Sequence, residues 1–291
     1  MLCAVRDLVN TNCSKHTLRN YRIDLRQFLE FVLPGETAIS TVGVNQVRNW
    51  LSALGELSAA SRARKQASLS SLFKWAVKFD YLPVNPTDKI DRIKLPISVP
   101  RGVGRKKVEK IIKAIPAENL RDRLLFSLIF ETGLRASEAL TLHIEDLDLT
   151  HDDEHMTVLG KGNRRRTVLL DDRTLVLLLK KYLKQTGYQH GPLFRATKND
   201  TGGPLRYQSI HELWQKYCSR AGVGNITLHQ LRHTHATELV NECVSLSTIK
   251  RRLGHSNMQT TLRYAEQIDA TADRELREWR RKKDVRNVDI V

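Results

Sequence analysis

The amino-acid sequence predicts a mainly helical protein of two domains, the second of which also contains a small antiparallel sheet. Apolar residues recur at helical spacing along most of the chain. That periodicity breaks over residues 81–104, which hold four of the eight prolines, and two short β-prone runs flank the tetrapeptide GKGN at 160–163. A chain of 291 residues, 41% of them hydrophobic and 27% charged, has the length and the globular composition for about two cores.

Three helices are expected in the N-terminal domain, over residues 14–32, 43–54 and 58–80. The first can be capped by Ser14 and has one apolar face, formed by Leu18, Tyr21, Leu25, Phe28, Leu29 and Val32. The third begins with cations set among alanines and serines, which allow close approach to a phosphate backbone. These candidate contacts are Arg62, Arg64 and Lys65. A solvated charged face is the alternative interpretation of the same residues.

Proline cannot continue a helix, so the proline-rich stretch predicts a linker between domains. We therefore expect a first domain over residues 1–82, a linker over 83–104 and a second domain over 105–291. The second domain should contain a hairpin within residues 154–171 and a charged C-terminal segment over 272–286. Its helices are expected over 106–115, 119–134, 172–187, 207–222, 227–240, 246–255 and 258–268.

The charge of the chain indicates a polyanionic partner. Lys and Arg number 48 against 32 Asp and Glu, a net charge of +16. The excess is spread over the chain, with 14 basic against 8 acidic side chains in residues 1–99 and 34 against 24 in residues 100–291. Neutralising phosphates with such side chains releases condensed counterions, which favours binding to nucleic acid.

Several other classes of protein are not favoured. No apolar run is long enough to cross a bilayer, and the first residues do not have the layout of a signal peptide. The four cysteines are scattered without a CxxC pair, which argues against a zinc ribbon or a disulfide scaffold. These observations predict a cytoplasmic protein that does not bind membranes.

The segment TLHQLRHTHATELV, residues 227–240, concentrates three histidines and an arginine within seven positions. His229 and His233 have the i, i+4 spacing of two helical metal ligands, but a zinc protease would have Glu where Gln230 stands. A third ligand could be sought only in HDDEH, residues 151–155, which is typical of a solvated turn. We therefore expect no metal at this segment.

A phosphate site explains more of the sequence. His229 and Arg232 are three residues apart and share a helix face, and an arginine fork can bind two oxygens of one phosphate. Other segments supply Arg135 with Glu138 at i+3, Lys161 at the tip of the hairpin, and His255 followed nine residues later by Tyr264. Each of these alone is usually a packed or surface side chain.

In this order, the motifs TGLRASE, GKGN, HQLRHTHAT and LGHSNMQTTLRYA resemble those of the tyrosine recombinases, also called the phage integrase family. The likeness in motifs spans about residues 130–265, and the helical N-terminal part resembles the family's core-binding domain, a SAM-like helical fold, in layout. The resemblance implies the tyrosine recombinase fold, with a core-binding domain and a catalytic domain whose C-terminal tail mediates oligomerisation. Trp279 in that tail would either pack on its own domain or dock on a neighbour.

The resemblance also implies a role for each motif residue. Tyr264 would be the nucleophile that forms a 3′-phosphotyrosine link with DNA, and Lys161 the general acid for the departing 5′ oxygen. The phosphate would be held by Arg135, Arg232, His229 and His255, with Glu138 supporting their geometry. A phenol with an ordinary pKa near 10 needs such cations to act as a nucleophile, and the chemistry needs no cofactor and no ATP. His233 and His235 are expected to pack or to bond to the backbone.

The expected partners are double-stranded DNA with a specific core site, a homo-tetramer on two such sites, and in some systems accessory DNA-bending proteins. The expected activity is strand exchange through a Holliday junction, in dimer or cointegrate resolution or in movement of a mobile element. Three alternatives stay open: a type IB topoisomerase, a DNA-binding regulator without catalysis, and a metal-dependent nuclease. A topoisomerase would share the bond-breaking groups, whereas a regulator would have lost some of the six motif residues.

Overall fold

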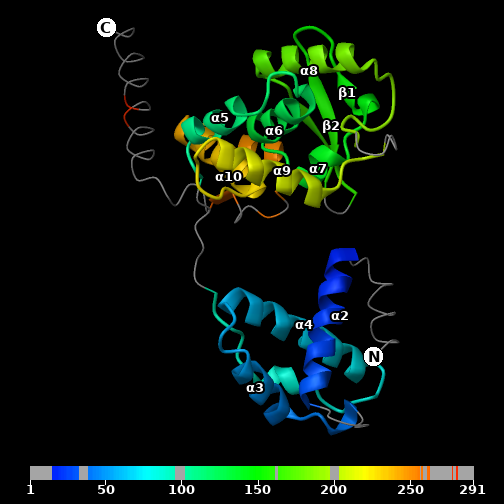
Figure 1. Cartoon of the computed structure of the whole chain (residues 1–291). Coiled ribbons are helices and arrows are strands. Elements are labelled where there is room, and N and C mark those ends of the chain that lie inside the picture. Colours follow the sequence, from blue (N-terminus) through cyan, green and yellow to red (C-terminus); the bar gives the residue numbers. More distant parts are fainter. Residues whose placement is uncertain are drawn as a thin grey trace, which may run out of the picture. The chain divides into compact units, whose positions relative to one another are not determined.

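The structure is a computed structural model of the whole chain that describes residues 15–32, 39–95, 102–160, 163–196, 203–255, 257, 261–262, 277 and 280. The chain divides into two compact units, Met1–Ser98 and Val99–Val291 (Figure 1). The first unit is helical, and the second combines helices with a small antiparallel sheet. The predicted fold class is therefore confirmed.

In the described part of the first unit, three α-helices pack around an aromatic centre. They are α2 (Lys15–Val32), α3 (Val44–Ala53) and α4 (Ala59–Lys78), with the 3-10 turn η1 (Ile39–Thr41) between α2 and α3. The ring of Phe28 lies edge-on to both Trp50 and Phe73, with centroids 5.2 and 6.0 Å apart. Because each helix contributes one of these buried rings, burial of the predicted apolar faces holds the unit together.

The proline-rich stretch after α4 belongs in large part to this first unit. Pro86–Lys89 forms the 3-10 helix η2, which packs against α3 and α4. The side chain of Gln66 donates to the carbonyl of Asp91 at 2.9 Å and accepts from the backbone N–H of Ile93 at 3.1 Å. The helix α4 ends at Lys78, before the first of these prolines, and Pro86 is compatible with the first position of a 3-10 helix. The division between the units falls after Ser98, within the predicted linker of residues 83–104.

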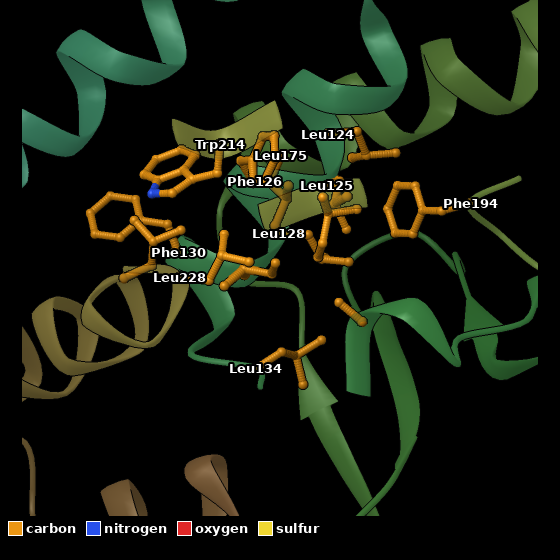
Figure 2. Close-up of a cluster of buried hydrophobic side chains, with 14 of the residues drawn as sticks. Leu124, Leu125, Phe126, Leu128, Phe130, Leu134, Leu175, Phe194, Trp214 and Leu228 are labelled. Atoms are coloured by element: carbon orange, nitrogen blue, oxygen red, sulfur yellow. The ribbon is translucent and has the colours of Figure 1, made fainter. Parts of the chain in front are cut away.

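In the second unit, α6 (Leu120–Thr132) is the central helix, and it is apolar on nearly every side. It contacts α5 (Arg105–Lys113), α7 (Ala136–Leu140), α8 (Arg173–Thr186) and α10 (Leu228–Asn241). Figure 2 shows the core around it, where Phe126 lies 4.8 Å from Trp214 of α9 (Tyr207–Arg220), measured between ring centroids. Among the described residues, α11 (Leu246–Leu253) follows α10 and packs on it.

The sheet has three strands in the order β1-β2-β3, all antiparallel: β1 (Leu147–Asp148), β2 (His155–Leu159) and β3 (Arg165–Leu169). The predicted hairpin is β2–β3, while the two-residue β1, the short 3-10 turn η3 (Ile144–Asp146) and the five-residue α7 carry too little periodicity to be predicted. Met156 pairs with Val168 and Val158 with Arg166, so one face of the hairpin points into the core. The turn itself, Lys161 and Gly162, lies outside the described residues.

Candidate active site

Two helix ends meet where the motif residues gather. α6 and α11 are each followed by a glycine in the left-handed conformation, Gly133 (φ 65°) and Gly254 (φ 66°). Arg135 comes two residues after the first glycine, and His255 directly follows the second. A methyl group added to Gly133 would lie 2.6 Å from Leu253 Cδ2. The two turns are therefore in close contact, and they bring Arg135 and His255 to one place.

Arg232, in α10, joins these two helix ends. Its side chain is only 2% exposed, and it donates from Nη1 to the carbonyl of Gly133 at 2.8 Å and from Nη2 to the carbonyl of Leu253 at 2.7 Å. Carbonyls at a helix C-terminus lack partners within the helix and carry a partial negative charge, which a cation stabilises. One guanidinium thus fixes the loops that carry both Arg135 and His255.

α10 itself starts at a point set by its own sequence. The Thr227 hydroxyl accepts from the backbone N–H of Gln230, and the Gln230 side chain accepts from the backbone N–H of Thr227 at 2.8 Å. This reciprocal capping box fixes the first turn of the helix. Gln230, at the position where a zinc protease would have glutamate, therefore caps the helix. This start of α10 places His229 and Arg232 in the first turns of the helix.

Glu138 is a buried carboxylate surrounded by guanidinium groups. It accepts from the backbone N–H of Arg135 at 2.9 Å and from Arg135 Nη1 at 2.7 Å, and Arg166 contacts both of its oxygens at 2.8 and 3.1 Å. Arg232 Nη1 lies 3.9 Å away. Burial alone would raise the pKa of Glu138, but the hydrogen bonds from Arg166 and Arg135 lower it to about 2. Three cations against one carboxylate leave the site positive.

Two neutral histidines lie beside these cations. His255 is buried, its Nδ1 is 2.9 Å from Thr261 Oγ1, and burial together with the charges of Arg232 and Arg135 lowers its pKa to about 4. His229 is exposed at the start of α10, 4.4 Å from His233 between ring centroids. Partial desolvation of the ring and the charges of the same two arginines lower its pKa as well. At neutral pH both imidazoles can donate or accept a proton.

The described part of the site therefore has the chemistry of a phosphate-binding site: fixed guanidiniums, neutral imidazoles, and a side chain, Arg135, that remains 34% exposed. Of the predicted residues, the structure brings together Arg135, Glu138, Arg232 and His255, with His229 close enough for its pKa to respond to the two arginines. Lys161 and Tyr264 lie outside the described residues, so their assignments stay predictions, as does that of Trp279.

Two arginines of the site were not predicted from the sequence. Arg166 binds Glu138 as described above. Arg252 donates to His235 Nε2 at 3.1 Å, to the Glu131 carbonyl at 3.0 Å and to Asp171 at 2.7 Å. His235 is therefore packed in the interior, as expected, and its ring bonds to a side chain rather than to the backbone. RRR at 164–166 and RR at 251–252 are visible as charge runs, but nothing in them marks which member turns inward.

The three candidate DNA contacts on α4 have different environments. Lys65 is buried and donates to Asp24 at 3.0 Å and to Gln27, and Arg64 also pairs with the buried Asp24. An ammonium committed to a buried carboxylate is poorly placed to reach a phosphate, so the structure argues against Lys65 as a DNA contact. Arg64 and Arg62 remain candidates, because Arg64 is 41% exposed and Arg62 is half-buried.

Within the described residues, no cluster of three or more His, Cys, Asp and Glu side chains could hold a metal ion. Over the same residues, no helix combines the length and apolar character of a membrane span.

Histidines buried near the site make the stability of the fold depend on pH. The folded-state pKa values of His233, His235 and His255 are about 4, 3 and 4, below the ordinary 6.5, mainly because of burial. Below about pH 6.5 the unfolded chain binds protons that the folded chain does not. Stability is therefore greatest above pH 6.5 and falls as the pH drops towards 4, by about 1.4 kcal/mol per pH unit for each histidine involved.

A His235→Gln variant should weaken this dependence, because a glutamine oxygen can accept from Arg252 but does not titrate. We expect the slope of unfolding free energy against pH between 6 and 4.5 to fall by about 1.4 kcal/mol per unit. Urea denaturation over this range measures the slope. An unchanged slope would show that His235 is not held neutral in the folded protein.

Comparison with known proteins places this site in a family. Residues 103–270 match the model of the phage integrase family, and residues 6–79 match the phage integrase N-terminal SAM-like domain. The tyrosine recombinase XerC of Staphylococcus carnosus is 31% identical over 260 residues, covering 86% of each chain. XerC of Staphylococcus aureus is 30% identical over 265 residues, covering 88% of this chain and 87% of that one.

Solved structures share the fold at lower identity. The XerH site-specific recombinase bound to palindromic difH substrate has a TM-score of 0.77 and 23% identity, covering 92% of this chain and 81% of that one. A lambda integrase (75–356) dimer bound to a COC′ core site has a TM-score of 0.74 and 18% identity, covering 91% and 94%. With a family model that matches more than half of its length and relatives at 30% identity along most of it, the chain belongs to the phage integrase family, the tyrosine recombinases.

Proposed function

We propose that this protein is a site-specific DNA recombinase that cuts and rejoins duplex DNA through a covalent 3′-phosphotyrosine intermediate. The observation that carries the proposal is the cationic site at the ends of α6 and α11. There Arg135 and Arg232 both lie within 4 Å of one buried carboxylate, next to the neutral His255. Such a site suits a phosphodiester whose negative charge increases as a nucleophile attacks.

In the proposed reaction, the Tyr264 oxygen attacks the scissile phosphorus and forms the bond to the 3′ phosphate as the bond to the 5′ oxygen breaks. Arg135 and Arg232 neutralise the non-bridging oxygens, and His255 donates a hydrogen bond to one of them. His229 accepts the phenolic proton, and Lys161 protonates the departing 5′ oxygen. The phosphotyrosine retains the energy of the broken bond, so a 5′ hydroxyl of another strand can reverse the steps and complete the exchange.

The two units would share the DNA. We infer that the N-terminal unit is the core-binding domain and that the C-terminal unit is catalytic, because the two family models match these parts of the chain separately. Both parts carry a positive excess, as a duplex-binding protein needs. Arg62 and Arg64 are the candidates for backbone contact on α4, and the segment after Tyr264 is the candidate for oligomerisation.

Strand exchange requires four active sites. The lambda integrase has been solved as a tetramer bound to a Holliday junction, and the same assembly on two core sites is our proposal for this protein. It would act where the DNA is, in the cytoplasm, with accessory DNA-bending proteins where the sites demand them. The proposed chemistry serves dimer resolution, cointegrate resolution and movement of a mobile element equally well. The similarity to the XerC relatives extends over most of their length.

The alternatives make different predictions. A regulator without catalysis is not favoured, since all six motif residues are present. A metal-dependent nuclease would be inhibited by chelators, whereas the tyrosine mechanism is indifferent to them. A type IB topoisomerase would relax any supercoiled plasmid, because it reseals the strand that it cuts.

The decisive assay offers the protein two supercoiled plasmids in EDTA, one with two candidate core sites from the flanking genome and one with none. We expect recombinant products, with exchanged flanks, from the first plasmid alone. Relaxation of the second plasmid at an equal rate would instead identify a topoisomerase, and failure of both reactions on every candidate site would contradict the proposed function.

A further inference from the structure

Arg166 occupies a position where the sheet would normally place an apolar side chain. In β3 it pairs with the buried Val158 of β2, and its neighbour on the same face, Val168, is buried as well. The Arg166 side chain is 12% exposed. A guanidinium on the core face of a hairpin must have its charge and its donors satisfied by the protein.

Its donors are divided between two segments of the active site. Nη1 and Nη2 bind Glu138 Oε1 and Oε2 at 3.1 and 2.8 Å, a two-pronged contact. Nε donates to the carbonyl of Arg252 at 3.1 Å. The first contact acts on the segment that contains Arg135, and the second acts on the last turn of α11, three residues before His255.

The Glu138 contact controls the orientation of Arg135. Glu138 binds Arg135 with the same two oxygens that Arg166 holds from the other side. Without Arg166, the carboxylate would lose two of its charge-assisted hydrogen bonds and could rotate. Its negative charge would then be shared only with Arg135 and Arg232, the two groups needed for the phosphate.

The contact with α11 is equally close. A methyl group added to Gly254 would lie 2.9 Å from the Arg166 guanidinium. The backbone of this glycine is therefore in close contact with the guanidinium group. Gly254 precedes His255, whose ring the site requires in one orientation. The largely buried side chain of Arg166 thus supports both sides of the phosphate site. It comes from β3, not from α6 or α11, the two helices that end at the site.

We propose that Arg166 is a positioning residue, which holds Glu138 and the end of α11 so that Arg135 and His255 face the same phosphate. The proposal rests on the recombinase function proposed above. It assigns Arg166 no contact with DNA, and it makes the geometry of the active site depend on the β2–β3 hairpin, which also carries Lys161.

The test uses the full-length protein and a nicked suicide substrate with the core site, and it measures DNA affinity and the single-turnover rate of covalent adduct formation separately. The variants are Arg166→Met, Arg166→Lys, Glu138→Gln and the double variant Arg166→Met with Glu138→Gln. Arg220→Met, at the exposed end of α9, is the matched control for loss of one positive charge. Gly254→Ala disturbs the same contact from the α11 side. Thermal unfolding identifies any variant that does not fold.

We expect Arg166→Met to slow adduct formation at least about tenfold, because a small misplacement of the reacting groups can cost about 100-fold, with DNA affinity close to that of Arg220→Met. Arg166→Lys should recover part of the rate, because one ammonium can reach Glu138 but cannot also bind the Arg252 carbonyl. The double variant should be scarcely slower than the single ones, because both act through the same contact. The acid limb of the rate profile should move to higher pH in Arg166→Met, since the carboxylate loses the partner that keeps it ionised.

Other outcomes would overturn the proposal. If DNA affinity falls as much as the cleavage rate, Arg166 binds the phosphate backbone directly. If all folded Arg166 and Gly254 variants cleave like the control, the contact does not position the site. Absence of any adduct from the unmodified protein would instead contradict the proposed function, so the two failures are distinguishable.

Discussion

Replacement of Arg232 by alanine is expected to slow DNA cleavage by about two to three orders of magnitude, the loss typical of removing one preorganised partner of a developing oxyanion. The effect on DNA affinity should be small, because a duplex-binding protein contacts many phosphates. Single-turnover adduct formation on a suicide substrate, with binding measured separately, gives both numbers.

Stability should fall in the same variant. Arg232 satisfies the carbonyls of Gly133 and Leu253 in a buried position, and each buried carbonyl left without a donor costs about 1–3 kcal/mol. Arg232→Lys keeps the charge but cannot bridge both carbonyls, so it should be intermediate in stability and still slow in cleavage. Arg220→Ala, on the exposed end of α9, is the control. If folded Arg232→Ala cleaves DNA within about threefold of the unmodified protein, Arg232 does not bind the scissile phosphate.

Tyr264→Phe should abolish strand cleavage altogether, which is the largest effect that we expect from any single substitution. The change removes one oxygen atom, and no other group in the proposed reaction can take its place as the nucleophile. Binding to the core site should be retained, and gel shifts at several salt concentrations can check this. Tyr207→Phe, at the exposed start of α9, is a matched control that should cleave normally. Residual cleavage by Tyr264→Phe would assign the nucleophile to another residue.

The motifs name candidate residues for the chemistry, but they do not predict how those residues are held in place. Arg135 and Glu138 are three apart, so their contact follows from local spacing. Arg166 and Glu138 are 28 residues apart, and Arg252 and Asp171 are 81 apart. Only the fold creates such contacts, and a run of arginines does not reveal which one faces the core.

The fold itself was predictable wherever the elements were long. Periodicity located the hairpin and the long helices of the described residues, whereas the helix predicted over 258–268 lies almost wholly outside them. The five residues of α7 and the two of β1 are shorter than any repeat that could reveal them. The prolines of the predicted linker do not reveal that Pro86–Lys89 packs against α3 and α4, because a proline can end an α-helix without ending a domain. The sequence suggests Lys65 as a DNA contact because it does not reveal the ion pair with Asp24, which lies 41 residues away.

The most direct test of the central claim is to identify the residue that carries the cleaved DNA. The unmodified protein would be trapped on a suicide substrate in EDTA, denatured in SDS and digested with nuclease and trypsin. Mass spectrometry should then find the nucleotide on the peptide of residues 264–274, which trypsin releases by cutting after Arg263 and Arg274, and fragmentation should place it on Tyr264. A nucleotide attached to any other peptide, or an adduct that forms only when a divalent metal is supplied, would contradict the proposal that Tyr264 attacks the DNA backbone with only the cations of this chain to assist it.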